Sequence, residues 1–254
     1  MAKLSDQKKI EVCFTPRSYE LYKSDFKIVV VIDVLRATSA ICAAIDSGVE
    51  KIIPVSTIPE AIEYQKQGYL VGAEREGKIV EGFDFGNSPF SYMDEQLKGK
   101  TIVLSTTNGT MAINTAADSS TVVIGSLLNL DVLCAWLIEQ NENTLILGSG
   151  WMNKFNLEDT VCAGAIADKL IESRLFKANE DSTVAAKFIY RSAKENIFGY
   201  LKASSHRRRL RKLNLNEDVK FCLTPNTMNT IPILRNGEIV KLDYVYEPVP
   251  VSFK

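Results

Sequence analysis

The chain has 254 residues, 46% of them hydrophobic and 24% charged, which is enough for one large domain or for a domain with a small subdomain. The 30 basic and 31 acidic residues give a formal net charge of −1, so the overall charge does not indicate nucleic acid or a membrane surface as a partner. The five cysteines are widely spaced and include no CxxC pair, which argues against a disulfide framework or a zinc site and predicts reduced thiols in the core.

Residues 1–7 are mainly polar and no apolar run follows them, so we expect no secretory signal. The longest apolar stretch, Ile28–Ile32, is too short to span a bilayer. These two features predict a cytoplasmic protein that does not enter a membrane.

Short apolar runs alternate with stretches of helical length between residues 27 and 176. Before them, Ile10–Phe14 alternates apolar with other residues, which predicts an additional, antiparallel strand. The later runs are continuous instead of alternating, as in strands that are buried on both faces. These runs are Ile28–Ile32, Ile52–Val55, Tyr69–Ala73, Ile102–Leu104, Val122–Ile124 and Leu145–Leu147.

Two of the intervening stretches carry signals of helix boundaries. Ser56 or Thr57 can cap a helix that has Pro59 in its first turn and Gly68 after its end. A second helix is predicted over Leu130–Gln140, with Asn129 as its cap. Repeated strand–helix units imply a mainly parallel sheet with right-handed crossovers.

The sequence changes character after residue 178. Residues 179–214 have the pattern of helices with aromatic and many charged side chains. Phe221–Leu223 is predicted to be a short strand, as are Ile231–Leu234 and Glu238–Leu242. An Asn-Gly pair at positions 236 and 237 separates the last two, which is a strong signal for a two-residue hairpin.

We therefore expect an α/β fold in two closely packed parts. Residues 1–178 would form the core, a mainly parallel sheet flanked by helices, with a ligand site at one edge of the sheet. Residues 179–254 would form a helical and β-hairpin extension that packs on the core and completes the site.

Polar residues follow four of the predicted strands, at the edge where a parallel sheet binds ligands. These segments begin at Asp33, at Glu74, at Thr106 and at Gly148, and the last leads to Glu158 and Asp159 in the next helix. Their carboxylates are suitable ligands for a hard cation, and their arginines can bind phosphate or carboxylate with two hydrogen bonds. Four strand ends thus predict one anion and metal site.

Each feature also has a simpler structural explanation. Asp33 can cap the following helix, and Arg36 and Arg75 can form ordinary salt bridges. Thr106–Thr110 can be only a tight turn. The negative charges of Glu158 and Asp159 can simply be favoured by the helix dipole at the start of a helix.

Several classes of phosphatase and nucleotide-binding site are excluded. His206 is the single histidine, which rules out a histidine phosphatase and a histidine-rich metal centre. No cysteine has the spacing to an arginine that a cysteine phosphatase needs, and Leu35 stands where haloacid-dehalogenase phosphatases have a second Asp. The glycine motifs of the standard nucleotide folds are missing as well. A metal-and-arginine site of this kind suits direct attack of water on phosphorus.

A basic segment, Lys202–Lys212, surrounds His206. It can be a solvated helix face, or one or two of Arg207, Arg208 and Arg209 can reach over the site to bind a second anion of the substrate.

Five motifs occur in order along the chain, namely Asp33–Ser39, Gly72–Arg75, Gly82–Pro89, Thr106–Thr110 and Glu158–Thr160. As a set they resemble the motifs of the 2-phosphosulfolactate phosphatase family, and the resemblance extends over residues 10 to 250. The resemblance implies a fold peculiar to that family and Mg²⁺-dependent hydrolysis of 2-phospho-3-sulfolactate to 3-sulfolactate and phosphate, a step in making coenzyme M.

From these motifs, and from the basic segment for Arg207 and Arg208, we assign expected roles. Catalytic residues are expected to be Asp33, Arg36, Glu74, Arg75, Asn108 and Asp159. Substrate contacts are expected from Thr38, Asn87, Ser88, Thr106, Thr107, Gly109, Thr110, Arg207 and Arg208. Mg²⁺ is expected to be held by some of Asp33, Glu74, Glu158 and Asp159.

Several alternatives remain open from the sequence. Hydrolysis can proceed by attack of a metal-bound water or through a covalent phosphoryl group on Asp33. The substrate can instead be a related phosphorylated hydroxy acid, and a non-catalytic anion-binding module is a third hypothesis. In each case the expected partner is a small anion and not nucleic acid or a membrane, and a homodimer is expected from base rates alone.

Overall fold

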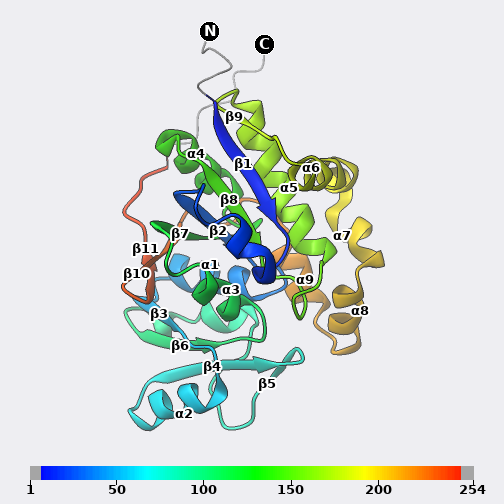
Figure 1. Cartoon of the computed structure of the whole chain (residues 1–254). Helices are drawn as coiled ribbons and strands as arrows, with labels where there is room; N and C mark the ends of the chain where they lie inside the picture. Colours follow the sequence, from blue (N-terminus) through cyan, green and yellow to red (C-terminus); the bar gives the residue numbers. More distant parts are fainter. Residues whose placement is uncertain (1–6, 247–254) are drawn as a thin grey trace.

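The computed structural model describes residues 7–246, and in this part of the chain one sheet of 11 strands runs through the molecule (Figure 1). The strand order is β5-β4-β6-β3-β11-β10-β7-β2-β8-β1-β9. The strands are β1 (Lys8–Cys13), β2 (Ile28–Ile32), β3 (Lys51–Pro54), β4 (Leu70–Arg75), β5 (Lys78–Ile79), β6 (Thr101–Ser105), β7 (Thr121–Gly125), β8 (Thr144–Gly148), β9 (Phe176–Lys177), β10 (Pro232–Arg235) and β11 (Glu238–Lys241).

The helices connect these strands and cover the sheet. They are α1 (Ala37–Asp46), α2 (Ile58–Lys66), α3 (Gly109–Thr115), α4 (Leu130–Gln140), α5 (Leu157–Glu172), α6 (Asp181–Ala193), α7 (Ile197–Tyr200), α8 (Ser205–Lys212) and α9 (Asn216–Cys222). Short 3₁₀ turns lie at Pro16–Leu21, Pro89–Tyr92, Glu95–Leu97, Lys194–Asn196 and Leu201–Ala203.

The expected α/β class and the six core strands are confirmed. β2 pairs in parallel with β7 and β8, and β6 pairs in parallel with β3 and β4. Every residue of β2 is buried, as a continuous apolar run predicts for a strand covered on both faces. The predicted cap of α2 is also present, because the Thr57 hydroxyl accepts a hydrogen bond from the Glu60 N–H.

The expected direction of the first strand is wrong. β1 is parallel to both of its neighbours, with Val12 opposite Ile146 of β8 and Lys8 opposite Phe176 of β9. Alternation of apolar residues shows which side chains are buried but carries no information about strand direction. The direction of β1 follows from its place within the parallel half of the sheet.

The predicted hairpin is confirmed, but it lies inside the sheet. Asn236 and Gly237 both have positive φ, 52° and 81°, as the tight turn between β10 and β11 requires. β10 is antiparallel to β7 and β11 is antiparallel to β3, with Ile239 opposite Ile52. The hairpin thus joins two sets of parallel strands, and the sheet draws on residues from both sides of the predicted boundary at 178/179.

The strand predicted at Phe221–Leu223 is wrong, because Phe221 and Cys222 form the end of α9. A run of three apolar residues has the same appearance in a strand and in a buried helix. In α9, the buried residues Asp218, Val219 and Cys222 have the spacing of one helix face. Residues 179–214 are largely helical, as predicted, and contain α6, α7 and α8.

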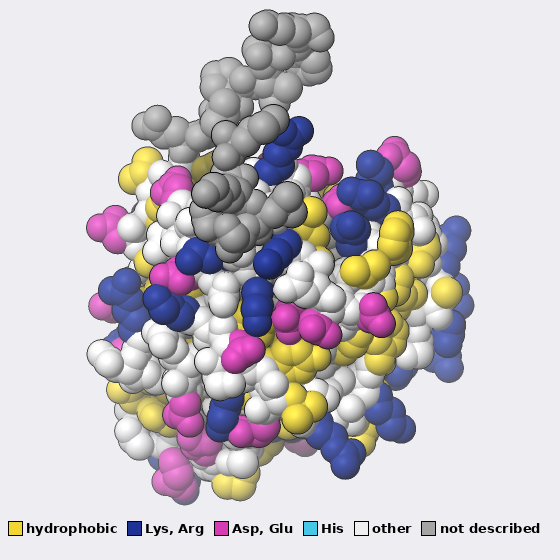
Figure 2. Space-filling model, turned by 45° about the horizontal axis from the view of Figure 1, so that its top comes forward, with side chains coloured by type: hydrophobic (Ala, Val, Ile, Leu, Met, Phe, Trp, Pro, Cys, Tyr) yellow, Lys and Arg dark blue, Asp and Glu magenta, His cyan; other side chains and the backbone are white. Residues whose placement is uncertain are grey.

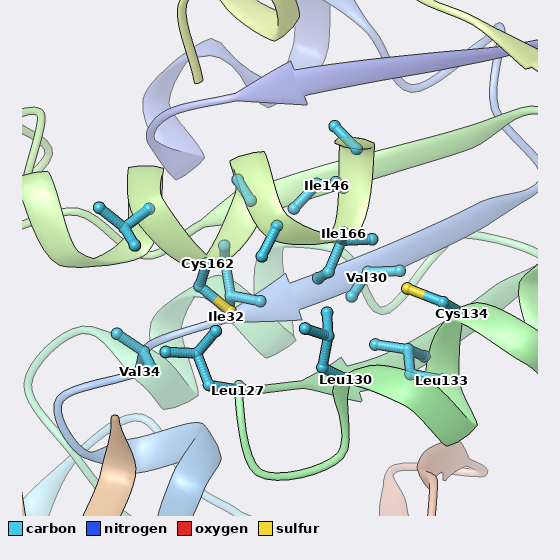
Figure 3. Close-up of a cluster of buried hydrophobic side chains, with 14 of the residues drawn as sticks. Val30, Ile32, Val34, Leu127, Leu130, Leu133, Cys134, Ile146, Cys162 and Ile166 are labelled. Carbon is cyan, nitrogen blue, oxygen red and sulfur yellow. The ribbon is translucent and has the colours of Figure 1, made fainter. Parts of the chain in front are cut away.

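Figure 3 shows part of the core between the sheet and two helices. Val30 of β2 lies near Ile166 of α5 and Leu133 of α4, and Ile32 lies near Cys162 of α5. All five residues belong to one buried cluster. This packing fixes β2, whose carboxyl end carries Asp33, on a rigid base.

On the face shown in Figure 2, acidic and basic side chains are intermixed, in line with the net charge near zero. Over residues 7–246, the structure has no helix of the length and apolarity needed to cross a membrane.

Candidate active site

A cavity lies at the carboxyl edge of the sheet and has an empty volume of about 300 Å³, part of it open to solvent. It contains five of the predicted site residues, Asp33, Arg36, Glu74, Asn87 and Asn108. They come from four separate loops or strand ends, which the parallel strands bring to the same edge. The other lining residues are Leu35, Gly77, Trp151, His206 and Leu210.

Asp33 follows β2 and is held by the turn that begins α1. Its backbone N–H donates to the Thr38 hydroxyl at 3.0 Å, so the predicted substrate ligand Thr38 positions the loop and does not line the cavity. Burial raises the pKa of Asp33 well above its ordinary value, and the negative charges of Asp159 and Glu74 raise it further. A cation beside Asp33 would favour its charged form.

Glu74 and Asn87 approach the cavity from β4 and from the loop that follows β5. Glu74 is 7% exposed, and its Oε1 accepts a hydrogen bond from the Gly77 N–H. Asn87 is buried, and its Oδ1 has no hydrogen-bond partner among the described residues. An unpaired buried acceptor is unfavourable, so this oxygen is available for a ligand. The predicted Ser88 is half-buried outside the cavity lining.

The loop after β6 packs closely against Asp33. A Cβ atom on Gly109 would lie 2.5 Å from the Ala37 Cβ and 3.0 Å from Asp33 Oδ2, so only glycine allows this approach. Asn108 lines the cavity, and its Oδ1 accepts from the Met152 N–H at 3.1 Å.

Two threonines of this loop, Thr106 and Thr110, form hydrogen bonds with each other. The Thr110 N–H donates to the Thr106 hydroxyl at 3.0 Å, and the Thr110 hydroxyl donates to the Thr106 carbonyl at the same distance. The Thr107 Oγ1 is buried and has no partner among the described residues. None of the three lines the cavity, so their expected contact with substrate stays a prediction.

Arg36 lines the cavity, but its orientation is set by a residue that sequence reasoning missed. Its Nη1 donates to Asp218 of α9 at 2.5 Å, and its Nη2 donates to the Gly77 carbonyl at 3.1 Å. The Arg36 side chain is only 4% exposed. No motif around Asp218 indicates this contact, which depends on the docking of α9.

Arg75 has a different position from the one expected. Its guanidinium donates to the Ser105 hydroxyl at 3.1 Å and to the Glu74 carbonyl at 2.6 Å. These contacts connect β4 to β6, and Arg75 does not line the cavity.

The predicted metal ligand Asp159 is saturated by donors from the protein. It accepts hydrogen bonds from the Val34 N–H (2.9 Å), the Ser149 hydroxyl (3.0 Å), the Gly150 N–H (3.2 Å) and the Asn156 amide (2.8 Å). Burial, followed by the charge of Glu158, raises the pKa of Asp159 to about 6. Asp159 therefore anchors the loops around the site and does not line the cavity.

Glu158 is likewise occupied. Its Oε2 accepts from the Ser204 hydroxyl at 2.8 Å, and its Oε1 lies 3.0 Å from Nδ1 of His206. The four predicted carboxylates thus do not meet at one point, and among residues 7–246 no group of three or more His, Cys, Asp or Glu is arranged to hold a metal.

Two carboxylates, Asp33 and Glu74, do line the cavity. Mg²⁺ is usually held by one or two carboxylates, with water and substrate phosphate as its other ligands. Burial, followed by the charges of Asp159 and Glu74, raises the pKa of Asp33, and a cation beside these carboxylates would offset both effects. Asp33 and Glu74 therefore fit a magnesium ion, and Glu158 and Asp159 do not.

The basic helix α8 divides its side chains between two surfaces. Arg207 donates to the Phe198 carbonyl and its guanidinium lies 3.7 Å from the centre of the Phe198 ring. Arg207 and Arg208 line a separate surface pocket together with Lys202 and Arg211. The structure therefore does not bring these two predicted substrate ligands to the cavity.

The opposite face of α8 carries His206, Arg209 and Leu210, which have the i, i+3, i+4 spacing of neighbours on a helix. The helical spacing of these three residues in the basic segment is the sequence signal that could have placed His206 at the site. His206 is not among the site residues predicted from the sequence. The His206 ring centre lies 5.3 Å from that of Trp151, and the Arg209 guanidinium lies 4.0 Å from the Trp151 ring.

A second, wider groove continues from the cavity past Gly77, Trp151, His206 and Leu210, and has an empty volume of about 860 Å³ that is partly open to solvent. Its charged lining residues are Glu76, Lys78, Arg209 and Lys212. The groove is thus net positive, and it extends the cavity toward a basic surface.

Comparison with known proteins gives a consistent result. The family model described as 2-phosphosulpholactate phosphatase matches residues 13–237. A protein of Caldanaerobacter subterraneus subsp. tengcongensis is 39% identical over 231 residues, which cover 87% of this chain and 95% of that protein. A protein of Thermotoga petrophila is 40% identical over 215 residues, 85% of this chain and 92% of that one. Both are named "Probable 2-phosphosulfolactate phosphatase".

Proposed function

Because the chain belongs to the 2-phosphosulfolactate phosphatase family, we propose that it hydrolyses 2-phospho-3-sulfolactate to 3-sulfolactate and inorganic phosphate. Besides the family match, one structural observation supports this proposal: the cavity at the sheet edge is continuous with the wider groove beside it. A small cavity with Asp33, Arg36 and Glu74 opens into a wider groove with Arg209 and a net positive lining.

The two spaces suit the two ends of this substrate. The phosphate fits the small cavity, where Arg36 is held in one orientation by Asp218 and the Gly77 carbonyl and keeps further N–H groups for a phosphoryl oxygen. The carboxylate and sulfonate fit the groove, where Arg209 lies against Trp151. The Arg209 Nη2 is buried and has no hydrogen-bond partner among the described residues, so an anionic oxygen would satisfy it.

In this proposal a magnesium ion is held by Asp33 and Glu74 in the cavity. When bound, Mg²⁺ supplies positive charge that stabilises the phosphoryl oxygens and favours attack by water. The chain's own residues do the remaining work: Arg36 balances phosphoryl charge, and Asn87 and Asn108 offer amide groups that orient the phosphate or the attacking water. Direct attack by water is the proposed route, and a covalent phosphoryl group on Asp33 is the alternative.

A panel of phosphate monoesters tests this proposal. With purified protein and Mg²⁺, we expect phosphate release to be fastest from 2-phosphosulfolactate and to stop when a chelator removes the metal. The matched comparison is 2-phospholactate, which has the same frame and lacks the sulfonate.

Equal turnover of the two esters would favour the second candidate, a phosphatase for a related phosphorylated hydroxy acid. Tight binding without any phosphate release across the panel would instead indicate an anion-binding module.

The cellular setting is part of the same proposal, namely a step of coenzyme M synthesis in the cytoplasm. All five cysteines are buried and free, which suits a reducing compartment. The homodimer stays a prediction that a light-scattering mass can check.

A further inference from the structure

We propose that His206 is a further catalytic residue, a general acid that protonates the ester oxygen of the leaving group, and that Glu158 is its positioning residue. This inference rests on the proposed phosphatase function and adds to it a group that donates a proton at a stated atom. It also gives Glu158, which does not reach the cavity, a role other than binding metal.

The two residues form a connected pair that leads from the protein interior to the cavity. Glu158 lies in the first turn of α5, and its side chain is 1% exposed. His206 lies in the first turn of α8, and its side chain is 14% exposed and lines both the cavity and the groove. The Nδ1–Oε1 distance between them is 3.0 Å.

A second contact holds the pair in place. The Ser204 hydroxyl donates to the other oxygen of Glu158 at 2.8 Å, and the same hydroxyl accepts from the Arg207 N–H as the N-cap of α8. The Trp151 ring adjoins the His206 ring, with 5.3 Å between their centres. Both helices and the aromatic neighbour therefore restrict the orientation of His206.

The hydrogen bond determines which ring nitrogen can act in the cavity. Burial works to raise the pKa of Glu158, but the hydrogen bond and charge of His206, followed by the Ser204 hydroxyl, lower it on balance. An ionised carboxylate only accepts hydrogen bonds, so Nδ1 of His206 must carry its hydrogen. Nε2 is then the nitrogen that gives and takes a proton, the arrangement in which a buried carboxylate orients a catalytic imidazole.

The proposed reaction needs a proton donor at the ester oxygen. When the bond between phosphorus and the ester oxygen breaks, its electron pair stays on that oxygen, which belongs to the alkoxide of a hydroxy acid, a poor leaving group. The Nε2 proton of His206 moves to this oxygen and gives the free hydroxyl. Water supplies the new oxygen on phosphorus and releases one proton to solvent, and solvent returns one proton to His206. The net reaction is ester plus water to hydroxy acid plus inorganic phosphate.

The leaving group provides the test. An aryl phosphate such as 4-nitrophenyl phosphate releases a stable phenolate that needs little protonation, whereas 2-phosphosulfolactate releases an alkoxide. We expect His206→Asn to lower kcat for 2-phosphosulfolactate roughly 10²- to 10⁴-fold and to leave kcat for the aryl ester within a few-fold of the wild type. Glu158→Gln should lower kcat in the same selective way, and by no more than His206→Asn does, because the amide no longer holds the imidazole in the required tautomer.

The activity on the aryl ester also reports that each variant is folded. Arg211→Ala is the matched control, because Arg211 is a charged residue of α8 that lines the other surface, and it should leave both activities unchanged.

An equal loss on both esters would assign His206 to binding or to structure and overturn the inference, as would full activity of His206→Asn on 2-phosphosulfolactate. If the wild type hydrolyses neither ester, it is the proposed function that fails, and this outcome is distinct from the other two.

Discussion

At the scale of single residues, the site concentrates negative charge at buried positions. Asp33 and Glu74 line the cavity, and Asp159 lies buried behind them. Burial and mutual repulsion make the charged form of Asp33 less favourable in the folded chain than in the unfolded one. Such an arrangement is unfavourable for stability and useful for binding a cation, as is common at active sites.

Asp33→Asn should therefore separate activity from stability. The substitution keeps the shape of the side chain and removes its charge, and we expect kcat to fall by at least ~10³, or roughly 4 kcal/mol of transition-state stabilisation. In metal-free buffer at pH 8 the same variant should unfold at a higher temperature than the wild type, because it removes the cost of burying the Asp33 charge and the smaller repulsion with Asp159 and Glu74.

The difference in unfolding temperature between Asp33→Asn and the wild type should depend on pH in a defined direction. A raised folded-state pKa means that the contribution of Asp33 to stability is complete below its ordinary pKa of 3.8 and is lost as the pH rises through the folded-state value. The advantage of the variant in thermal unfolding should thus shrink from pH 8 toward pH 4.5. The N-cap position of α1 is Arg36, without a side-chain cap, so Asp33 does not serve as a helix cap. Near-normal activity of Asp33→Asn would therefore remove Asp33 from the mechanism and leave Glu74 as the acidic residue of the cavity.

At the scale of elements, the hairpin β10–β11 is the connection that unites the sheet. It lies between β3 and β7, and its pairing with both is antiparallel in a sheet whose other long pairings are parallel. Ile239 of β11 is fully buried, and it stands opposite Ile52 of β3. The last strands of the described chain are thus central to the core, although they come long after the strands that they join.

Ile239→Ala should destabilise the protein as a core substitution does, by about 2–5 kcal/mol in the free energy of unfolding. The matched control is Ile79→Ala in the edge strand β5, where the isoleucine is 58% exposed and the change should stay within about 0.5 kcal/mol. Urea unfolding followed by circular dichroism measures both. Similar small losses in the two variants would mean that the hairpin is a peripheral extension.

At the scale of the whole molecule, one continuous sheet predicts one cooperative unit. The reactivity of the five cysteines can test whether the two parts of the chain unfold together, because four lie before residue 178 and Cys222 lies after it. All five are buried, and Figure 3 shows Cys134 and Cys162 among apolar side chains. Burial raises the pKa of Cys42, Cys134 and Cys222 to about 12, which suppresses the reactive thiolate at neutral pH.

We therefore expect no thiol to react rapidly with a disulfide reagent in native buffer at pH 7.5. With increasing urea, all five should become reactive in a single transition that coincides with the loss of secondary structure. Mass spectrometry of the labelled peptides measures each site. Labelling of Cys222 at lower urea than the other four would show that residues 179–254 unfold as a separate part.

The sequence by itself determined the local features of this protein. The apolar runs specified the six core strands, the Asn-Gly pair specified the hairpin, and the strand-end motifs specified the family and the cavity residues Asp33, Glu74, Asn87 and Asn108. These features depend on neighbours along the chain: on the period of burial, on turn conformation, and on the rule that parallel strands present their carboxyl ends at one edge.

Only the tertiary structure decided the direction of β1, the insertion of the hairpin between β3 and β7, and the partners of the charged groups. Asp218 holds Arg36 across 182 positions of sequence, and His206 meets Glu158 across 48. A charged side chain gives no sequence signal of its partner, because the choice follows from which elements pack together and from the need to satisfy a buried charge. The same need left Asp159 and Glu158 bound to protein donors, whereas Asp33 and Glu74 face the cavity.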